Sequence, residues 1–163
     1  MRPSASLILA VFGMLISMVA APAANASARM GRVERAIVRT LDRHRASYGV
    51  RPVHPSRRLA RAADAHSRDM LARNYFAHSS SSGASFSTRI HHYVHSSRIG
   101  ENLAYVSSCH GRRAAHLVVR MWMHSPAHRA IMLSRSFHRV GVALRRGRLG
   151  SRHACVVTAD FAR

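Results

Sequence analysis

The spacing of apolar residues changes along this chain, and the change limits its fold more than any other feature. Between residues 28 and 70, apolar residues recur every three or four positions, as on one face of a helix. From residue 140 to residue 161, two runs alternate apolar with polar residues around a turn at 146–150 that is rich in glycine and arginine, which predicts a β-hairpin. Helices followed by strands favour an α+β fold in which helices pack on an antiparallel sheet.

The same spacing predicts individual elements. A first helix covers residues 28–48 and ends at Gly49 and Pro52, and a second begins near Pro55 and Ser56. The apolar faces of these two helices are predicted to comprise, in turn, Val33, Ile37, Leu41, His44 and Tyr48, and Leu59, Ala62, Ala63, His66 and Met70. The remaining predicted elements are a short helix at 87–92, a helix through 115–122 and an extended segment at 100–106.

The N-terminal segment has the composition of a secretory signal. Arg2 precedes an apolar run at 7–21, and small residues then continue to Ala28. The run is shorter than the roughly 20 residues that a bilayer-spanning helix needs. We therefore predict a signal peptide at 1–28, cleavage after Ala28, and a secreted mature domain at 29–163. The alternative is an uncleaved membrane anchor.

The mature segment has a normal length for one domain with a real core. It contains two cysteines, Cys109 and Cys155. An even pair in an oxidising compartment indicates a disulfide rather than a metal site, and two free thiols are the alternative. Closing this loop would stabilise the fold by roughly 4 kcal/mol in the chain-entropy model.

The charge of the chain is strongly positive. Its 26 basic residues are all arginine, only six residues are acidic, and the formal net charge is +20. Such a surface should attract polyanions such as acidic wall polymers or anionic lipid head groups. Nucleic acid is not expected as a specific partner, because no binding motif occurs and aromatic residues are few. The excess of arginine also fits the coding bias of a GC-rich genome. We expect a monomer.

Seven segments occur in the order and spacing of a known family. By them the chain resembles the CAP superfamily (cysteine-rich secretory proteins, antigen 5 and pathogenesis-related 1; SCP domain) in its compact bacterial form. The resemblance covers essentially all of residues 29–163. The segments are AADAHSRDM at 62–70, YFAH at 75–78, RI at 89–90, GEN at 100–102, Trp122 with SPAHR at 125–129, VGV at 140–142, and DF at 160–161.

The resemblance implies an α-β-α sandwich with a small antiparallel sheet between helices, and a cleft lined by two histidines and two acids. The matching positions are His78, Glu101 and His128. The second acid falls near Ser125, where this chain has no carboxylate, so Ser125 is the fourth expected cleft residue. The chain also lacks the glycine-aromatic pair before GEN and the aromatic-Thr-Gln stretch before the final Asp-Phe.

The residues themselves suggest a metal site in this cleft. Ser125 and Pro126 are predicted to begin a helix, with Ser125 as N-cap and Pro126 at the first helical position. His128 would then lie in the first turn, where the positive end of the helix favours the neutral imidazole that a metal needs. His78, His128 and Glu101 could hold a divalent ion such as zinc and leave one position open. Alternatively, these three residues bond one another and only brace the cleft.

Our preferred function is that of a non-enzymatic, extracellular binding protein whose cleft holds a divalent metal or a small ligand, lipid included. The alternatives are a secreted metal-assisted hydrolase and a cationic protein that binds polyanions or the cell wall. A Ser125–His128–Glu101 triad is disfavoured, because an N-capping serine is already engaged and no nucleophile elbow surrounds it. His66 is interpreted as a core residue and His124 as a surface residue.

Overall fold

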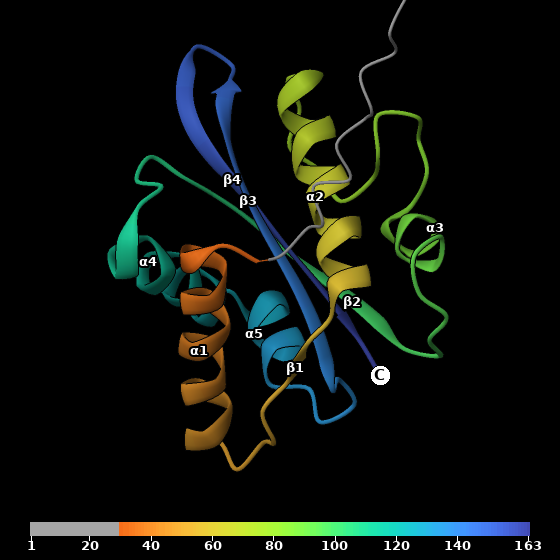
Figure 1. Cartoon of the computed structure of the whole chain (residues 1–163), viewed down its shortest axis with the longest axis vertical. Helices are drawn as coiled ribbons and strands as arrows, with labels where there is room; N and C mark the ends of the chain where they lie inside the picture. The colour runs from red at the N-terminus through yellow and green to blue at the C-terminus, as the bar shows by residue number, and fades with distance from the viewer. Residues whose placement is uncertain (1–29) are drawn as a thin grey trace, which may run out of the picture.

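The hairpin predicted near the C-terminus forms the centre of the sheet. In the computed structural model, which describes residues 30–163, the strand order is β1-β3-β4-β2 (Figure 1). The predicted signal peptide lies outside these described residues. The elements are α1 (Arg32–Ser47), β1 (His54–Pro55), α2 (Arg57–Ala72), α3 (Phe86–His91), β2 (Ile99–Val106), α4 (Gly111–His124), α5 (Pro126–Met132), β3 (Arg139–Leu149) and β4 (Arg152–Ala162).

The predicted antiparallel sheet is confirmed for β2, β3 and β4. β4 pairs antiparallel with β3 on one side and with β2 on the other. No pattern in the sequence indicated β1, whose two residues pair parallel with the start of β3. The hairpin turn is shorter than predicted, because the β3–β4 pairing continues to Leu149 and Arg152. Gly150 then makes the turn with a φ of 64°, a backbone conformation that glycine adopts readily.

Helices cover both faces of the sheet, so the predicted α-β-α sandwich is confirmed. α1, α4 and α5 lie on one side and α2 and α3 on the other (Figure 1). The larger core is formed between α1, α4 and the sheet around Trp122, which is fully buried and donates its Nε1–H to the carbonyl of Leu103 at 2.8 Å. Smaller clusters around Leu59 and Met70 fix α2 and α3 to the other face.

The predicted face of α2 is confirmed, and that of α1 is only partly right. Ile37 and Leu41 are buried, but Tyr48 is 48% exposed and His44 is only partly buried. Arg45 takes the buried position at the end of the helix, because its guanidinium finds backbone acceptors there. It donates hydrogen bonds to the carbonyls of Arg51, Met132, Ser134 and Phe137 at 2.7–3.1 Å.

The predicted disulfide joins Cys109, just before α4, to Cys155 on β4, with 5.6 Å between their Cα atoms. It ties the start of α4 to the sheet across a sequence separation of 46 residues. Among residues 30–163, no helix is both long and apolar enough to cross a membrane.

Candidate functional site

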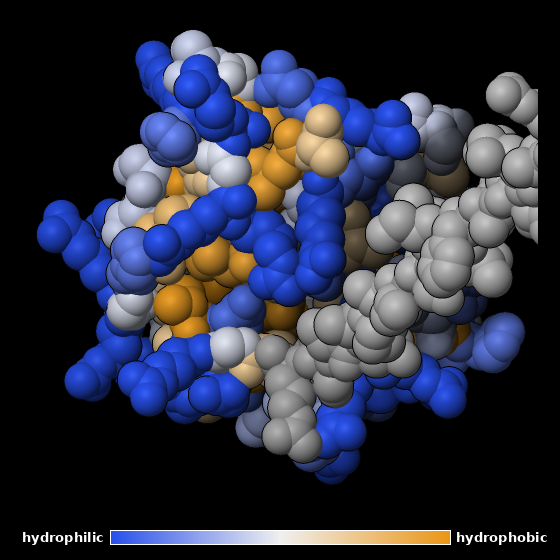
Figure 2. Space-filling view, turned by 45° about the horizontal axis from the view of Figure 1, so that its top comes forward, coloured by the Kyte–Doolittle hydropathy of each residue, from blue (hydrophilic) through white to orange (hydrophobic). Residues whose placement is uncertain are grey.

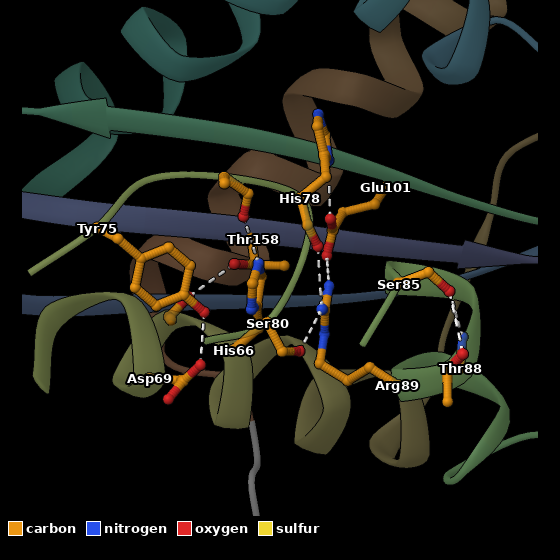
Figure 3. A network of polar contacts seen from close by, with 12 residues as sticks. His66, Asp69, Tyr75, His78, Ser80, Ser85, Thr88, Arg89, Glu101 and Thr158 are labelled. Carbon is orange, nitrogen blue, oxygen red and sulfur yellow. Dashed lines mark hydrogen bonds and ion pairs between the residues drawn. The ribbon is translucent and has the colours of Figure 1, made fainter. Parts of the chain in front are cut away.

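Glu101 is the centre of a polar network beside the edge strand β2. Its side chain is fully buried, whereas that of its partner His78 is 50% exposed. Oε1 of Glu101 lies 2.8 Å from Nδ1 of His78, and Oε2 accepts a hydrogen bond from Nη2 of Arg89 (Figure 3). Both carboxylate oxygens are therefore engaged by the protein itself.

Arg89 makes the burial of this carboxylate possible. Its side chain is 9% exposed, and a buried carboxylate without a cation would cost several kcal/mol. The guanidinium also donates to the carbonyl of His78 and to Oγ of Ser80, each at 3.1 Å. One arginine on α3 thus neutralises Glu101 and holds the loop that carries His78.

The other end of this loop is fixed by Asp69 on α2. Its carboxylate accepts hydrogen bonds from the hydroxyl of Tyr75 at 2.5 Å and from the backbone and hydroxyl of Ser81 at 3.1 and 2.9 Å. Burial alone would raise the pKa of Asp69, but these hydrogen bonds and one from Arg73 lower it to about 2. His66, buried on α2, bonds through Nε2 to the carbonyl of Ala77 at 2.9 Å, which confirms its interpretation as a core residue.

A second buried carboxyl group lies beside Glu101. Asp160 on β4 is its direct partner in the β2–β4 ladder, and its own two oxygens have no donor among the described residues. Burial raises the pKa of Asp160 well above its usual range, and the negative charge of Glu101 raises it further. Both effects favour the protonated form of Asp160.

The ring of His128 lies near that of His78, where the family resemblance predicts a cleft. The two ring centroids are 6.4 Å apart with 43° between the ring planes. The carbonyl of His128 accepts a hydrogen bond from Nδ2 of Asn102 at 3.1 Å, which fixes α5 to β2. Burial, and then the positive charge of a protonated His78, lower the pKa of His128, so its imidazole is neutral at neutral pH.

Ser125 and Pro126 begin α5 as predicted, but the capping bond is absent. Ser125 has the extended backbone of an N-cap, and its hydroxyl makes no capping hydrogen bond. The structure also shows no hydrogen bond between Ser125, His128 and Glu101 within residues 30–163, since Glu101 is bonded to His78 and Arg89 instead. The hydrogen bonds of a serine triad are therefore not formed. His124 is exposed and bonds only a carbonyl of its own helix, Arg120, as expected for a surface residue.

The arrangement of these side chains leaves a metal only the two imidazoles of His78 and His128, and not the predicted set of both imidazoles with Glu101. No group of three His, Cys, Asp or Glu side chains within the described part of the chain has the arrangement of a metal site. Glu101 is already bonded to His78 and Arg89. A carboxylate that accepts the Nδ1–H of a histidine leaves the Nε2 of that histidine free to bind a metal, which is a common arrangement. Two imidazoles on one tetrahedral zinc ion, with Zn–N bonds of about 2.1 Å, would have ring centroids about 5.3 Å apart. The centroids of His78 and His128 are 6.4 Å apart, so the two rings would have to move closer together to share an ion.

Comparison with known proteins identifies the family. The family model described as CAP, cysteine-rich secretory protein family, matches residues 38–161, which is most of the chain. The chain belongs to the CAP family. A relative of this CAP domain is the protein YkwD of Bacillus subtilis (strain 168), named as uncharacterized, which is 29% identical over 119 residues. The match covers 72% of this chain but 44% of the relative, so the chain spans less than half of that protein.

Solved structures show the same fold. An extracellular SCP-domain protein from Bacillus anthracis str. Ames superposes with a TM-score of 0.66 and 23% identity, over 80% of this chain and 40% of that one. An outer surface protein from Borrelia burgdorferi gives a TM-score of 0.67 at 17% identity, over 83% and 96% of the two chains. The same fold therefore makes up nearly all of one of these proteins and less than half of the other.

Two residues of the site were not assigned to it from the sequence of this CAP protein. Arg89 and Asp160 stood in matching segments, but nothing in the sequence placed them beside Glu101. Asp160 gave one weak signal, its place between the apolar residues Ala159 and Phe161. Alternation along β4, however, puts it on the opposite face, where a charged residue is expected at the surface. Arg89 gave no such signal, because basic residues are frequent everywhere in this chain.

Proposed function

We propose that this CAP-family protein is a non-enzymatic, extracellular binding protein whose cleft between His78 and His128 takes a divalent metal or a small ligand. The observation that carries the proposal is that Glu101 is buried and fully engaged by His78 and Arg89. This leaves the two imidazoles as the groups available to a ligand. The half-exposed His78 keeps the cleft open to solvent.

With zinc as the ligand, Nε2 of His78 and a ring nitrogen of His128 would hold the ion. Glu101 would accept the Nδ1–H of His78, which fixes the tautomer and raises the basicity of the coordinating nitrogen. Bound zinc would supply Lewis acidity to a water or ligand group at its open positions. Arg89 bonds the other oxygen of Glu101 and so supports this arrangement indirectly.

An extracellular location fits the relatives. One structural neighbour is named as an extracellular protein and another as an outer surface protein. Cys109 and Cys155 form a disulfide, a bond that persists in oxidising compartments. Both observations agree with the signal peptide predicted at residues 1–28.

Zinc titration by calorimetry tests the proposal on residues 29–163. Wild type should bind at about pH 7.5, and His78→Ala and His128→Ala should each lower the affinity at least about tenfold by removing a ligand. His124→Ala is the matched control, because His124 is an exposed histidine outside the cleft and should leave zinc binding unchanged. Equal binding by all three variants would contradict the proposal. Zinc-dependent hydrolysis of a generic ester or peptide panel, lost with either cleft variant, would favour the hydrolase instead.

A further inference from the structure

A second cleft lies between α1 and the start of α4, with arginines on both of its walls. It encloses about 1170 Å³. Its basic lining residues are Arg32, Arg35, Arg39 and Arg43 of α1, Arg112 and His116 of α4, His110, and Arg146 of β3. Small apolar side chains contribute to its lining, among them Val33, Ala36 and Ala46. Figure 2 shows one face of the molecule, on which long hydrophilic side chains lie around and across hydrophobic surface.

These arginines have no counterions within the described part of the chain. None of the six forms an ion pair there, and the only acid in the lining, Asp42, accepts the amide of Val53 at 3.0 Å. The acids of the protein make their contacts elsewhere, so the positive charge at this cleft is not compensated. Their contacts are Glu34 with Arg145, Asp42 with Val53, Asp64 with Arg68 and Arg145, Asp69 with Arg73, Glu101 with Arg89, and Asp160 buried beside Glu101.

The α1 arginines form a row rather than a single anion site. They follow one another at spacings of three and four residues, so they share one face of the helix. At a rise of 1.5 Å per residue, the row from Arg32 to Arg43 extends over roughly 16 Å. One carboxylate or lipid head group could engage only part of this row. A ligand that fills it must carry negative charges at intervals along its length.

We infer that the α1–α4 cleft binds a linear phosphodiester polymer with a polyol backbone, of the kind that acidic wall polymers have. Phosphates would pair with the arginine row and with Arg112 and Arg146 opposite, and the C–H groups of the short polyol units would lie on the small apolar side chains. A flat bilayer cannot enter a concave cleft to reach both walls. A nucleic acid strand would bind here through little more than its phosphates. Phe, Tyr and Trp are absent from the lining, so its bases have no aromatic ring to stack on.

This inference does not depend on His78 and His128. The test uses synthetic poly(glycerol phosphate) and residues 29–163, with binding measured from low to physiological salt. The cleft variant is Arg35→Gln, Arg39→Gln and Arg43→Gln combined. The matched control is Arg57→Gln, Arg58→Gln and Arg61→Gln, which removes the same charge from an exposed part of α2 outside the cleft.

The cleft variant should bind at least about tenfold more weakly at low salt, and its plot of log K against log salt should be shallower by about 2. The control should retain most of the affinity and the slope. Equal losses in the two variants would overturn the inference, because the binding would then follow net charge alone. So would a cleft-dependent preference for anionic phosphatidylglycerol vesicles or for single-stranded DNA over the polymer. Circular dichroism and melting curves verify that all three proteins are folded.

Discussion

Asp160 lies directly opposite Glu101 in the β2–β4 ladder, and both carboxyl groups are buried. Two carboxylates so close together cannot both remain ionised in the interior. Arg89 pairs with Glu101, so Asp160 is the member that keeps its proton. One carboxylate (Glu101), one carboxylic acid (Asp160) and one guanidinium (Arg89) are thus buried next to His78.

Asp160→Asn should stabilise the protein at neutral pH. Because the pKa of Asp160 is raised in the folded protein, folding at a pH above about 4 requires its carboxyl group to take up a proton. The free-energy cost of this uptake grows as pH rises from about 4 toward the folded-state pKa. Asparagine keeps the shape and a donor toward Glu101 without that cost. We expect a gain on the order of 1 kcal/mol at pH 7 that disappears below about pH 4, measured by urea unfolding. A variant less stable than wild type at pH 7 would show that Asp160 is ionised.

Arg89→Met should destabilise the fold by about 3–5 kcal/mol, because it leaves Glu101 buried without a cation. Arg68→Met is the control and should cost no more than about 1 kcal/mol, since Arg68 is itself exposed and its partner Asp64 keeps a second cation in Arg145. Chemical denaturation of both variants gives the comparison. Similar small losses in the two would mean that Arg89 does not hold the charge of Glu101.

Ser125→Ala should change stability by less than about 0.5 kcal/mol, because the Ser125 hydroxyl makes no capping bond. Ser85→Ala should cost about 1 kcal/mol, because the hydroxyl of Ser85 accepts the amide of Thr88 at 3.1 Å at the start of α3. Thermal melts of the pair measure the difference. A larger loss at Ser125 than at Ser85 would restore the capping role that the sequence predicted.

Gly141→Ala should destabilise the protein by at least about 2 kcal/mol. A Cβ atom at Gly141 would lie 2.0 Å from the backbone nitrogen of Ala60, where α2 packs directly on β3. Gly147→Ala should cost less, because its Cβ would meet only the movable end of Leu71, at 3.0 Å or more. Equal unfolding free energies for the two variants would contradict the close packing of α2 on the sheet.

The layers of this fold could be predicted because they depend on periodic apolar burial, and α2 with Leu59 and Met70 on its inner face shows this well. The site could be predicted only where a family motif carried it, as for His78, Glu101 and His128. Periodicity treats charged residues as surface residues and therefore missed Arg45, whose burial depends on four carbonyls, three of them from the distant segment 132–137. Asp160 and Arg89 were missed for the same reason, since each is buried only because of a partner on another element.

Nitrogen-15 NMR of the histidine side chains during zinc addition tests the central claim most directly. At about pH 7.5, two of the 13 histidines, His78 and His128, should show large shifts of one ring nitrogen each, and Nδ1 of His78 should stay protonated by virtue of Glu101. As pH falls through about 6.5 the shifts should disappear, because protonated imidazole is no ligand. Shifts confined to other histidines, or none with excess zinc, would contradict a metal-binding cleft between His78 and His128.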